Sequence, residues 1–471
     1  MQEINHVYID GRFVEPHGTE LFDLHNPTTG EVFGRVRLGD VEDARAAIAA
    51  ARRAFPSWSR SSKTERIALL HRLYEVMDAR EDALVDAIVL EYGAPMSRAT
   101  WMAAHASNSF MDAARTLEKF DLKRQIGTAD VIMQPVGVVG LITPWNSNAG
   151  FICSKLAYAL AAGCTAVIKP SEMSAAQTQV VLEALHEAGA PPGLFNIVNG
   201  RGDVVGAEIT ANPGISKISF TGSTAVGKAI LRGAAETLKR VTLELGGKSP
   251  TVILDDADFA KAIPLALEAG FMNSGQACIA GTRILVPASR LDEAIAEIKT
   301  AIRKVKAGAP RDADTTIGPM VSQTQYERVQ RYIRLGIEAG ATVVAGGEGH
   351  PDGLGGYFVK PTVFSNVTND MRIAREEIFG PVLSVIAYDS EDEAIRIAND
   401  SKYGLHAAVI GTDPQRARRV ASELRAGRVV INGMTDDPQA PWGGFKYSGV
   451  GREYGLYGIE AFLETRAILE A

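Results

Sequence analysis

From residue 136 onward, short apolar runs alternate with segments of helical periodicity, and no other feature of the sequence constrains the fold as strongly. Strands and helices that alternate at this spacing predict βαβ units around a parallel sheet. A capping box at Ser174 and Gln177 predicts the start of one intervening helix, which should end at Gly189-Ala190-Pro191. The strands expected here are residues 138–143, 165–169, 195–198 and 217–220.

The alternation restarts after Gly246-Gly247, which predicts a second α/β unit. Its expected strands are residues 251–254 and 283–286, and its expected helices are residues 258–272, 291–306 and 324–339. Residues 1–120 instead predict a short β-rich start followed by helices, one over residues 41–55 and one capped by Ser62 and Glu65. The tail, residues 466–471, is typical of an exposed strand, and such a strand usually finds a partner, often in another subunit.

The composition excludes several classes of protein. Of 471 residues, 46% are hydrophobic and 22% are charged, which excludes a collagenous, disordered or coiled-coil chain. A net charge of −7 gives no electrostatic reason to expect nucleic-acid binding. Residues 131–154 carry no charge, but prolines and polar residues interrupt them, so we expect strand and turn rather than a membrane span. Three scattered cysteines and a start without a basic or apolar signal segment predict a reducing, cytoplasmic location.

Cys278 is a candidate nucleophile because it lies among small residues, in the segment NSGQACIAG (residues 273–281). A thiol that directly follows a helix end can be approached by a substrate. Nearby backbone N–H groups can lower its pKa and bind an oxyanion. Taken alone, such a cysteine is more often a small core residue, and Cys153 and Cys164 are expected in the core.

Two polar residues could assist such a thiol. Glu244 closes an apolar run and precedes glycines, so its pKa should be raised, which suits a general base. Asn146 could offer a side-chain N–H group to developing negative charge. The alternatives are a surface glutamate at a strand end and an ordinary turn residue.

Two further segments could bind a nucleotide. Residues 220–228, FTGSTAVGK, predict a strand, a glycine turn and a helix start, where free N–H groups suit a pyrophosphate. They do not form the G-x-G-x-x-G fingerprint. Lys169 and Glu172, in the segment KPSE, could bind ribose hydroxyls, although a charged surface turn is the simpler reading of KPSE alone. We expect neither a Ser-His-Asp triad nor a metal site, because no such order or H-E-x-x-H spacing is present.

Taken together, these segments resemble the aldehyde dehydrogenase superfamily. Seven motifs occur in order: PWN (144–146), KPSE (169–172), FTGS (220–223), ELGGK (244–248), GQAC (275–278), EEIFGP (376–381) and PWGGFKYSG (441–449). The resemblance implies a Rossmann-like cofactor domain (residues 1–117 and 137–245) and an α/β catalytic domain (246–447). It also implies a small β oligomerisation arm with a C-terminal tail (118–136 and 448–471), and hence a homodimer or homotetramer.

The resemblance also implies roles. Cys278 would form a thiohemiacetal with an aldehyde, and Asn146 and the Cys278 N–H group would hold the oxyanion. Hydride transfer to NAD would leave a thioester, which water activated by Glu244 would hydrolyse. Glu172 would accept from a ribose 2′-hydroxyl and repel a 2′-phosphate, so NAD is favoured over NADP. The implied cofactor residues are Thr143, Pro144, Trp145, Lys169, Ser171, Glu172, Gly222, Ser223, Leu245, Gly246, Glu377 and Phe379.

The substrate follows less directly from the resemblance. The residues expected along the substrate tunnel are Ser147, Phe151, Ser154, Ala277, Ile279, Asp436 and Trp442. Several replace larger or aromatic residues of the family, which predicts a more polar and partly wider tunnel. Asp436 and Asp437 at its mouth would disfavour dicarboxylic semialdehydes by like-charge repulsion, unless both face solvent.

Three alternatives remain open from the sequence. One is a CoA-acylating semialdehyde dehydrogenase, although acylating members typically lack the base that Glu244 supplies. Another is a Cys-Glu esterase or thioesterase, against which the nucleotide segments argue. A third is a silent scaffold, which has no chemical reason to keep Cys278, Glu244 and Asn146 together.

Overall fold

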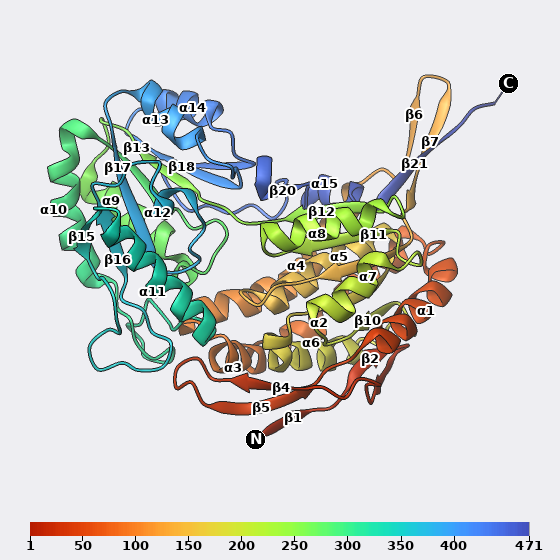
Figure 1. Cartoon of the computed structure of the whole chain (residues 1–471). Helices are drawn as coiled ribbons and strands as arrows, with labels where there is room; N and C mark the ends of the chain where they lie inside the picture. The colour runs from red at the N-terminus through yellow and green to blue at the C-terminus, as the bar shows by residue number, and fades with distance from the viewer. Residues whose placement is uncertain (471) are drawn as a thin grey trace.

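The computed structural model describes residues 1–470 and contains two large sheets, two small sheets and their covering helices (Figure 1). The first large sheet has the order β20-β12-β11-β8-β9-β10-β2-β3, and its five central strands are parallel. Its strands are β2 (Val7–Ile9), β3 (Arg12–Val14), β8 (Val138–Ile142), β9 (Thr165–Lys169), β10 (Phe195–Ile197), β11 (Lys217–Thr221), β12 (Arg240–Glu244) and β20 (Gly449–Val450).

Helices cover both faces of this sheet, which explains why β8, β9, β10 and β11 are buried at every position. In β8, Val139 and Leu141 join the core on one face, while Val138 and Ile142 join the core on the other. The first face carries α2 (Lys63–Asp78), α3 (Glu81–Glu91), α4 (Met96–Lys119), α5 (Asn148–Ala162) and α6 (Ala175–Glu187). The second carries α1 (Val41–Trp58), α7 (Ala207–Ala211) and α8 (Thr224–Ala235).

The second large sheet has the order β15-β16-β17-β14-β13-β18-β19 and is parallel except at β15. Its strands are β13 (Pro250–Ile253), β14 (Arg283–Pro287), β15 (Thr342–Ala345), β16 (Thr362–Ser365), β17 (Val382–Tyr388), β18 (His406–Ile410) and β19 (Arg428–Ile431). One face packs on α9 (Phe259–Phe271) and α10 (Leu291–Ala301). The other packs on α11 (Gln323–Glu338), α12 (Arg372–Arg375), α13 (Glu391–Asn399) and α14 (Pro414–Glu423).

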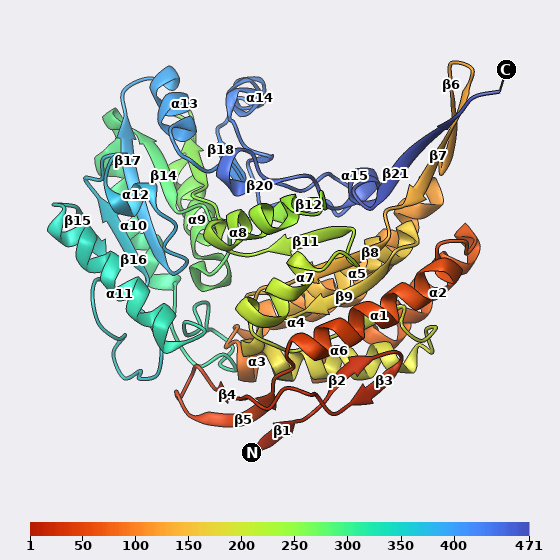
Figure 2. The same ribbon diagram turned by 45° about the vertical axis from the view of Figure 1, so that its right-hand side comes forward.

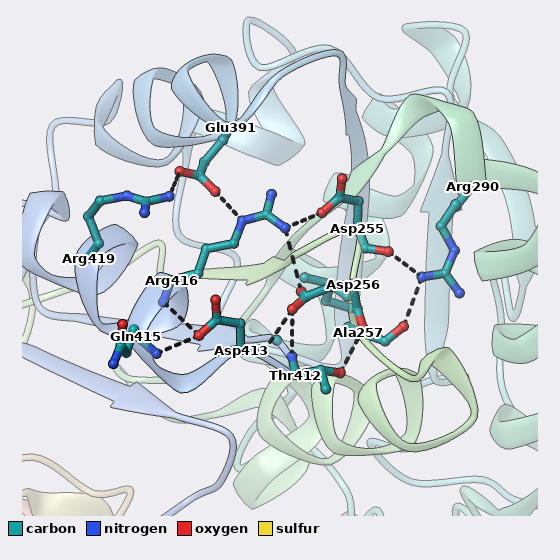
Figure 3. A network of polar contacts seen from close by, with 12 residues as sticks. Asp255, Asp256, Ala257, Arg290, Glu391, Thr412, Asp413, Gln415, Arg416 and Arg419 are labelled. Atoms are coloured by element: carbon teal, nitrogen blue, oxygen red, sulfur yellow. Dashed lines mark hydrogen bonds and ion pairs between the residues drawn. The ribbon is translucent and has the colours of Figure 1, made fainter.

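Ion pairs tie together the segments that follow β13 and β18, as Figure 3 shows. Arg416 near the start of α14 binds the Asp255 carboxylate, and its Nε donates to Glu391 Oε2 at 2.6 Å. Asp256 Oδ2 accepts from the Asp413 backbone N–H group at 2.8 Å. These contacts hold the start of α14 against the end of β13.

A three-stranded arm projects from the body of the molecule (Figure 2). It consists of β6 (Lys123–Ile126), β7 (Ala129–Pro135) and β21 (Leu463–Ile468), in the order β21-β7-β6. The strand predicted at the C-terminus therefore begins earlier than residue 466 and pairs with β7 of its own chain; Ala471 lies outside the described residues. The helix α15 (Gly455–Glu460) precedes the arm, and the N-terminal strands β1 (Gln2–Ile4), β4 (Leu21–His25) and β5 (Val32–Arg37) form the remaining sheet.

One predicted helix cap is wrong. The Ser62 and Glu65 box is present at α2, but the Ser174 side chain makes no capping bond at α6. The Glu91 carboxylate from the end of α3 instead accepts hydrogen bonds from the Ala176 and Gln177 backbone N–H groups, at 2.8 and 3.0 Å.

Most predicted strands and helices are present, with most ends displaced by one or two residues. The last expected turn of α10 is a separate 3₁₀ turn. Every helix within residues 1–470 is too short or too polar to cross a membrane.

Candidate active site

A cavity of about 270 Å³ lies at the carboxyl ends of β8, β11 and β12, where ligands bind in open parallel sheets. Eleven of the predicted catalytic and cofactor residues line it together. They are Pro144, Trp145, Asn146, Gly222, Ser223, Glu244, Leu245, Gly246, Cys278, Glu377 and Phe379. The fold thus brings together segments that are more than 200 residues apart in the sequence.

The loop before Cys278 has an unusual backbone. Asn273, Ser274 and Gly275 have φ values of 54°, 58° and 72°, and two of these residues carry side chains. Left-handed geometry at such residues costs on the order of 1–3 kcal/mol each and persists only where neighbouring contacts enforce it. Here a Cβ on Gly275 would collide with the Gly380 carbonyl group. The strained turn directs the chain at Cys278 into the cavity.

Asn146 is bound to that loop. Its Nδ2 donates to the Gln276 carbonyl oxygen at 3.0 Å, and Asn273 Nδ2 donates to the Asn146 carbonyl oxygen at 3.1 Å. The amide predicted as an oxyanion donor is therefore held beside the nucleophile loop. These bonds fix its position before any substrate binds.

Cys278 is half-buried, whereas Cys153 and Cys164 are fully buried. Burial, followed by the charges of Glu377 and Glu244, raises the pKa of the Cys278 thiol to about 12. Backbone N–H groups of Cys278 and Ile279 oppose this rise only in part. The expectation of a lowered pKa is therefore wrong, because it left out the burial of the thiol and two carboxylates from other parts of the chain.

Glu244 lies at the end of β12 and is 3% exposed. Burial, followed by the charge of Glu453, raises its pKa well above the usual value, as the sequence predicted. Neither carboxylate oxygen has a hydrogen-bond partner within residues 1–470. A buried carboxyl group without partners is suited to bind a water molecule, and this arrangement fits a general base.

The residues predicted to hold a dinucleotide form an anion-binding turn. Ser223 caps α8, its Oγ accepting from the Val226 N–H group at 3.3 Å, and Gly222 precedes it. The N-terminus of this helix of 12 residues therefore faces the cavity with the polarity that a pyrophosphate requires. Across the cavity, Glu377 Oε1 accepts from the Gly247 N–H group at 2.9 Å. A Cβ on Gly246 would collide with this carboxylate, so only glycine permits the approach.

The remaining predicted cofactor residues lie outside this cavity, at the ends of β8 and β9. Lys169 Nζ donates to Glu172 Oε2 at 2.9 Å, and Arg201 lies 3.9 Å from the same carboxylate. Thr143 donates to Asn148 Oδ1 at 3.2 Å, and Ser171 Oγ accepts from the Met173 N–H group at 3.3 Å.

None of the predicted tunnel residues lines the cavity around Cys278, although Ala277 and Ile279 flank Cys278 in the chain. Ser147 directly precedes α5 but its side chain makes no capping bond, and the first turns of α5 carry Phe151 and Ser154. Trp442 contacts Tyr454, with ring centroids 6.3 Å apart. Asp436 Oδ1 lies 3.2 Å from Arg428 Nη2, so the carboxylate is paired rather than free.

The sequence analysis missed three residues that line the cavity, Thr221 at the end of β11 and Gln325 and Arg328 on α11. Arg328 donates to the Glu377 and Ile378 carbonyl oxygens at 2.6 and 3.1 Å. Gln325 donates to the Phe379 carbonyl oxygen at 2.6 Å. In the sequence, Gln325 and Arg328 resemble the solvated polar residues of any amphipathic helix. No local signal could therefore have identified these two residues.

Comparisons with known proteins agree on one family. The sequence model of the aldehyde dehydrogenase family matches residues 13–468. The chain is 46% identical to 3-succinoylsemialdehyde-pyridine dehydrogenase from a Pseudomonas species, over 100% of this chain and 99% of the relative. It is similar to a mutant of aldehyde dehydrogenase C from Pseudomonas syringae in complex with NAD+ and octanal, with a TM-score of 0.97, 45% identity and coverage of 99% and 96%. Betaine aldehyde dehydrogenase from Staphylococcus aureus, in complex with NAD+, gives a TM-score of 0.95 at 39% identity, covering 98% of this chain and 94% of that structure.

Proposed function

The chain belongs to the aldehyde dehydrogenase family, and from this premise we propose that it oxidises an aldehyde to the carboxylic acid with NAD+ as hydride acceptor. One observation carries the proposal. Cys278, Glu244 and Asn146 line the same cavity as the residues suited to a dinucleotide. Solved relatives that hold NAD+ support the choice of cofactor.

In the first step, Cys278 Sγ forms a bond to the aldehyde carbon, and the carbonyl oxygen becomes an oxyanion. Asn146 Nδ2 and the Cys278 backbone N–H group donate to that oxyanion. Because burial keeps the thiol protonated near neutral pH, a base has to take its proton. Glu244 lines the same cavity as Cys278. Its carboxylate receives the thiol proton directly or through a water molecule.

Bound NAD+ supplies the acceptor for the hydride that leaves the thiohemiacetal carbon, and the enzyme is left as a thioester on Cys278. Gly222, Ser223 and the start of α8 hold the pyrophosphate, while Glu377 and Phe379 hold the nicotinamide ribose. Lys169 and Glu172 hold the adenosine ribose, where the Glu172 carboxylate disfavours a 2′-phosphate. Pro144, Trp145, Leu245 and Gly246 line the cavity itself, whereas Thr143 and Ser171 follow β8 and β9, beside Lys169 and Glu172.

Glu244 then acts a second time, after releasing its first proton. It takes a proton from water, the water oxygen bonds to the thioester carbon, and the Cys278 thiolate leaves. The raised pKa of Glu244 suits this role because a basic carboxylate accepts a proton more readily. This base favours hydrolysis over transfer to CoA.

We assign the cofactor domain to residues 1–117 and 137–245, and the catalytic domain to residues 246–447. The arm and tail comprise residues 118–136 and 448–471, which join copies of the chain into a dimer or tetramer. The arm's projection from the body supports this assignment (Figure 2).

The test is NADH formation by the purified protein with a panel of aliphatic, aromatic, amino- and carboxylated aldehydes. NAD+ and NADP+ are compared, each with and without CoA. Turnover with NAD+ in the absence of CoA is the expected result. A strict requirement for CoA would support the acylating alternative, whereas ester hydrolysis without NAD+ and no NADH formation would support an esterase.

A further inference from the structure

A cavity of about 540 Å³ lies beside the Cys278 loop and has no part in the mechanism above. Met272 and Asn273, at the start of that loop, line one of its walls. Asn273 Nδ2 donates to the Asn146 carbonyl oxygen at 3.1 Å, so this wall also borders the catalytic residues. Helices α4, α9 and α10 form most of the other walls.

The wall formed by α4 carries a stack of three side chains. The Arg98 guanidinium lies 4.0 Å from the centroid of the Trp101 ring, and Trp101 stacks on His105 with centroids 5.0 Å apart and planes at 7°. A Cβ on Gly150, at the start of α5, would lie 3.0 Å from His105 Cδ2. The stack therefore extends from the cavity to the helix that follows Asn146, and it holds Arg98 in one orientation.

Arg98 is a half-buried cation without a counter-charge. Its Nε is buried and has no hydrogen-bond partner, and no carboxylate in the described part of the chain lies within ion-pair distance of its guanidinium. Burial accordingly lowers the pKa of Arg98. The other charged groups of the cavity are Glu268, Glu297 and Lys304, of which Glu268 and Lys304 are exposed at its rim. A buried cation is costly unless it is paired, so a free guanidinium beside a cavity indicates an anionic ligand.

We infer that Arg98 binds a carboxylate at the far end of the substrate, so that the preferred substrates are aldehydes that carry a terminal carboxylate. The inference rests on the proposed function and identifies its substrate class. A guanidinium matches a carboxylate with two parallel N–H···O bonds. The apolar walls, among them Leu267, Phe271 and Met272, accommodate the methylene chain between the two ends. Because Met272 and Asn273 line this cavity and begin the loop that carries Cys278, the inference places the aldehyde end of the substrate at this wall.

This inference opposes the expectation drawn from Asp436 and Asp437. The charge of Asp436 raises the pKa of Arg98, but less than burial lowers it. The Asp436 carboxylate itself pairs with Arg428 at 3.2 Å, and its side chain is 55% exposed. Asp437 is also exposed. Solvent and Arg428 therefore weaken the repulsion by these aspartates, whereas Arg98 is half-buried and its Nε is shielded from water.

The test compares aldehydes of equal length with and without a terminal carboxylate, such as 6-oxohexanoate with hexanal and 8-oxooctanoate with octanal. The wild type should have the higher kcat/KM for the carboxylated member of at least one pair. Arg98→Gln should lower kcat/KM for that substrate about tenfold or more, mainly through KM, because a hydrogen-bonded charge pair is lost. For the matched alkanal, kcat/KM of Arg98→Gln should stay within about twofold of the wild-type value.

Two further variants serve as controls. Arg98→Lys should recover part of the preference, because it keeps the charge but loses the paired geometry. Lys299→Gln removes an exposed cation of α10 that does not line the cavity, and it should change kcat/KM for neither substrate. The inference would be overturned if Arg98→Gln lowered kcat/KM equally for the carboxylated aldehyde and its matched alkanal. It would also be overturned if the wild type oxidised alkanals but showed no higher kcat/KM for the carboxylated member of any pair. Failure of the wild type on every aldehyde would instead refute the proposed function.

Discussion

At the residue scale, the reactivity of the site depends on what burial does to two acids in one cavity. Cys278 and Glu244 both have raised pKa values, because each loses hydration and each is close to other carboxylates. The thiol is therefore mostly protonated at neutral pH, and its reactivity should follow the small thiolate fraction. This contrasts with cysteines that neighbouring cations activate.

The first prediction concerns alkylation of the apo protein by iodoacetamide. The rate at Cys278 should rise about tenfold per pH unit from pH 6 to 9, because the pKa of this thiol lies above that range. Cys153 and Cys164 are fully buried and should react only after denaturation. Peptide mass spectrometry gives the site and the rate. A rate that levels off near pH 7, or modification of Cys153 in the native state, would contradict this account.

The candidate catalytic residues could be predicted from the sequence because each lies within a motif of contiguous residues, such as GQAC around Cys278. The sequence did not reveal the direction of the Cys278 pKa shift, because the burial of the thiol and the approach of Glu377 and Glu244 arise only in the tertiary fold. It also gave no sign of Arg98. A lone arginine on a helix resembles a solvated surface cation until the walls of its cavity are in place.

At the element scale, α11 orients the segment that closes the cofactor side of the cavity. Arg328 and Gln325 bind three successive carbonyl groups, those of Glu377, Ile378 and Phe379. Phe379 has a φ of 65° and packs edge-on against Trp145, with ring centroids 5.4 Å apart. A non-glycine residue in this conformation needs such external support.

We therefore expect Arg328→Met to weaken NAD+ binding about tenfold, since two charge-assisted hydrogen bonds to this segment are lost. The single-turnover rate at saturating NAD+ should change less. Calorimetric titration with NAD+ measures the first effect, and stopped-flow kinetics measures the second. Arg331→Met is the matched control, because Arg331 is an exposed arginine of the same helix. Unchanged NAD+ affinity in Arg328→Met would mean that the segment holds its conformation without α11.

A second element-scale prediction concerns Glu91, which caps α6 from the end of α3. Burial raises its pKa to about 8, although the Ala176 and Gln177 N–H groups oppose the rise. Because the pKa is lower in the unfolded chain, unfolding releases a proton between about pH 5 and 8, and stability falls as pH rises through this range. Glu91→Gln should make the thermal midpoint less dependent on pH in this window. A parallel pH dependence in the variant and the wild type would show that Glu91 does not titrate there.

Strands and helices were predictable where the pattern is local, as at β9 and α2. The predicted α6 cap failed for a tertiary reason. Ser174 and Gln177 have the right spacing, but the buried Glu91 carboxylate reaches the same N–H groups from a different helix. Sequence periodicity cannot show which of two acceptors lies closer.

At the scale of the whole molecule, the projecting arm exposes an edge strand and apolar side chains that nothing in the same chain covers within residues 1–470. All of β6 is exposed, and Ile468 and Leu469 in and after β21 are 42% and 71% exposed. Exposed edge strands that carry apolar residues favour pairing with another chain. Sedimentation velocity at micromolar concentration should therefore detect a dimer or tetramer.

Replacing both Ile468 and Leu469 with Glu should shift this assembly toward smaller species, because it places charge in an apolar contact. Leu21→Glu is the control, since Leu21 is an exposed apolar residue of β4, in the N-terminal sheet rather than the arm. A monomeric wild type would refute the proposed role of the arm. An unchanged assembly in the double variant would place the contact elsewhere.

The most direct test of the central claim is to trap the acyl-enzyme in Glu244→Gln. This variant, mixed with NAD+ and an aldehyde that the wild type oxidises, should form NADH in a burst close to one equivalent per site and then turn over slowly. Intact-mass spectrometry should find the matching acyl group on Cys278, and Cys278→Ala should give neither burst nor adduct. Full steady-state turnover by Glu244→Gln, or an NADH burst without an adduct on Cys278, would contradict the account.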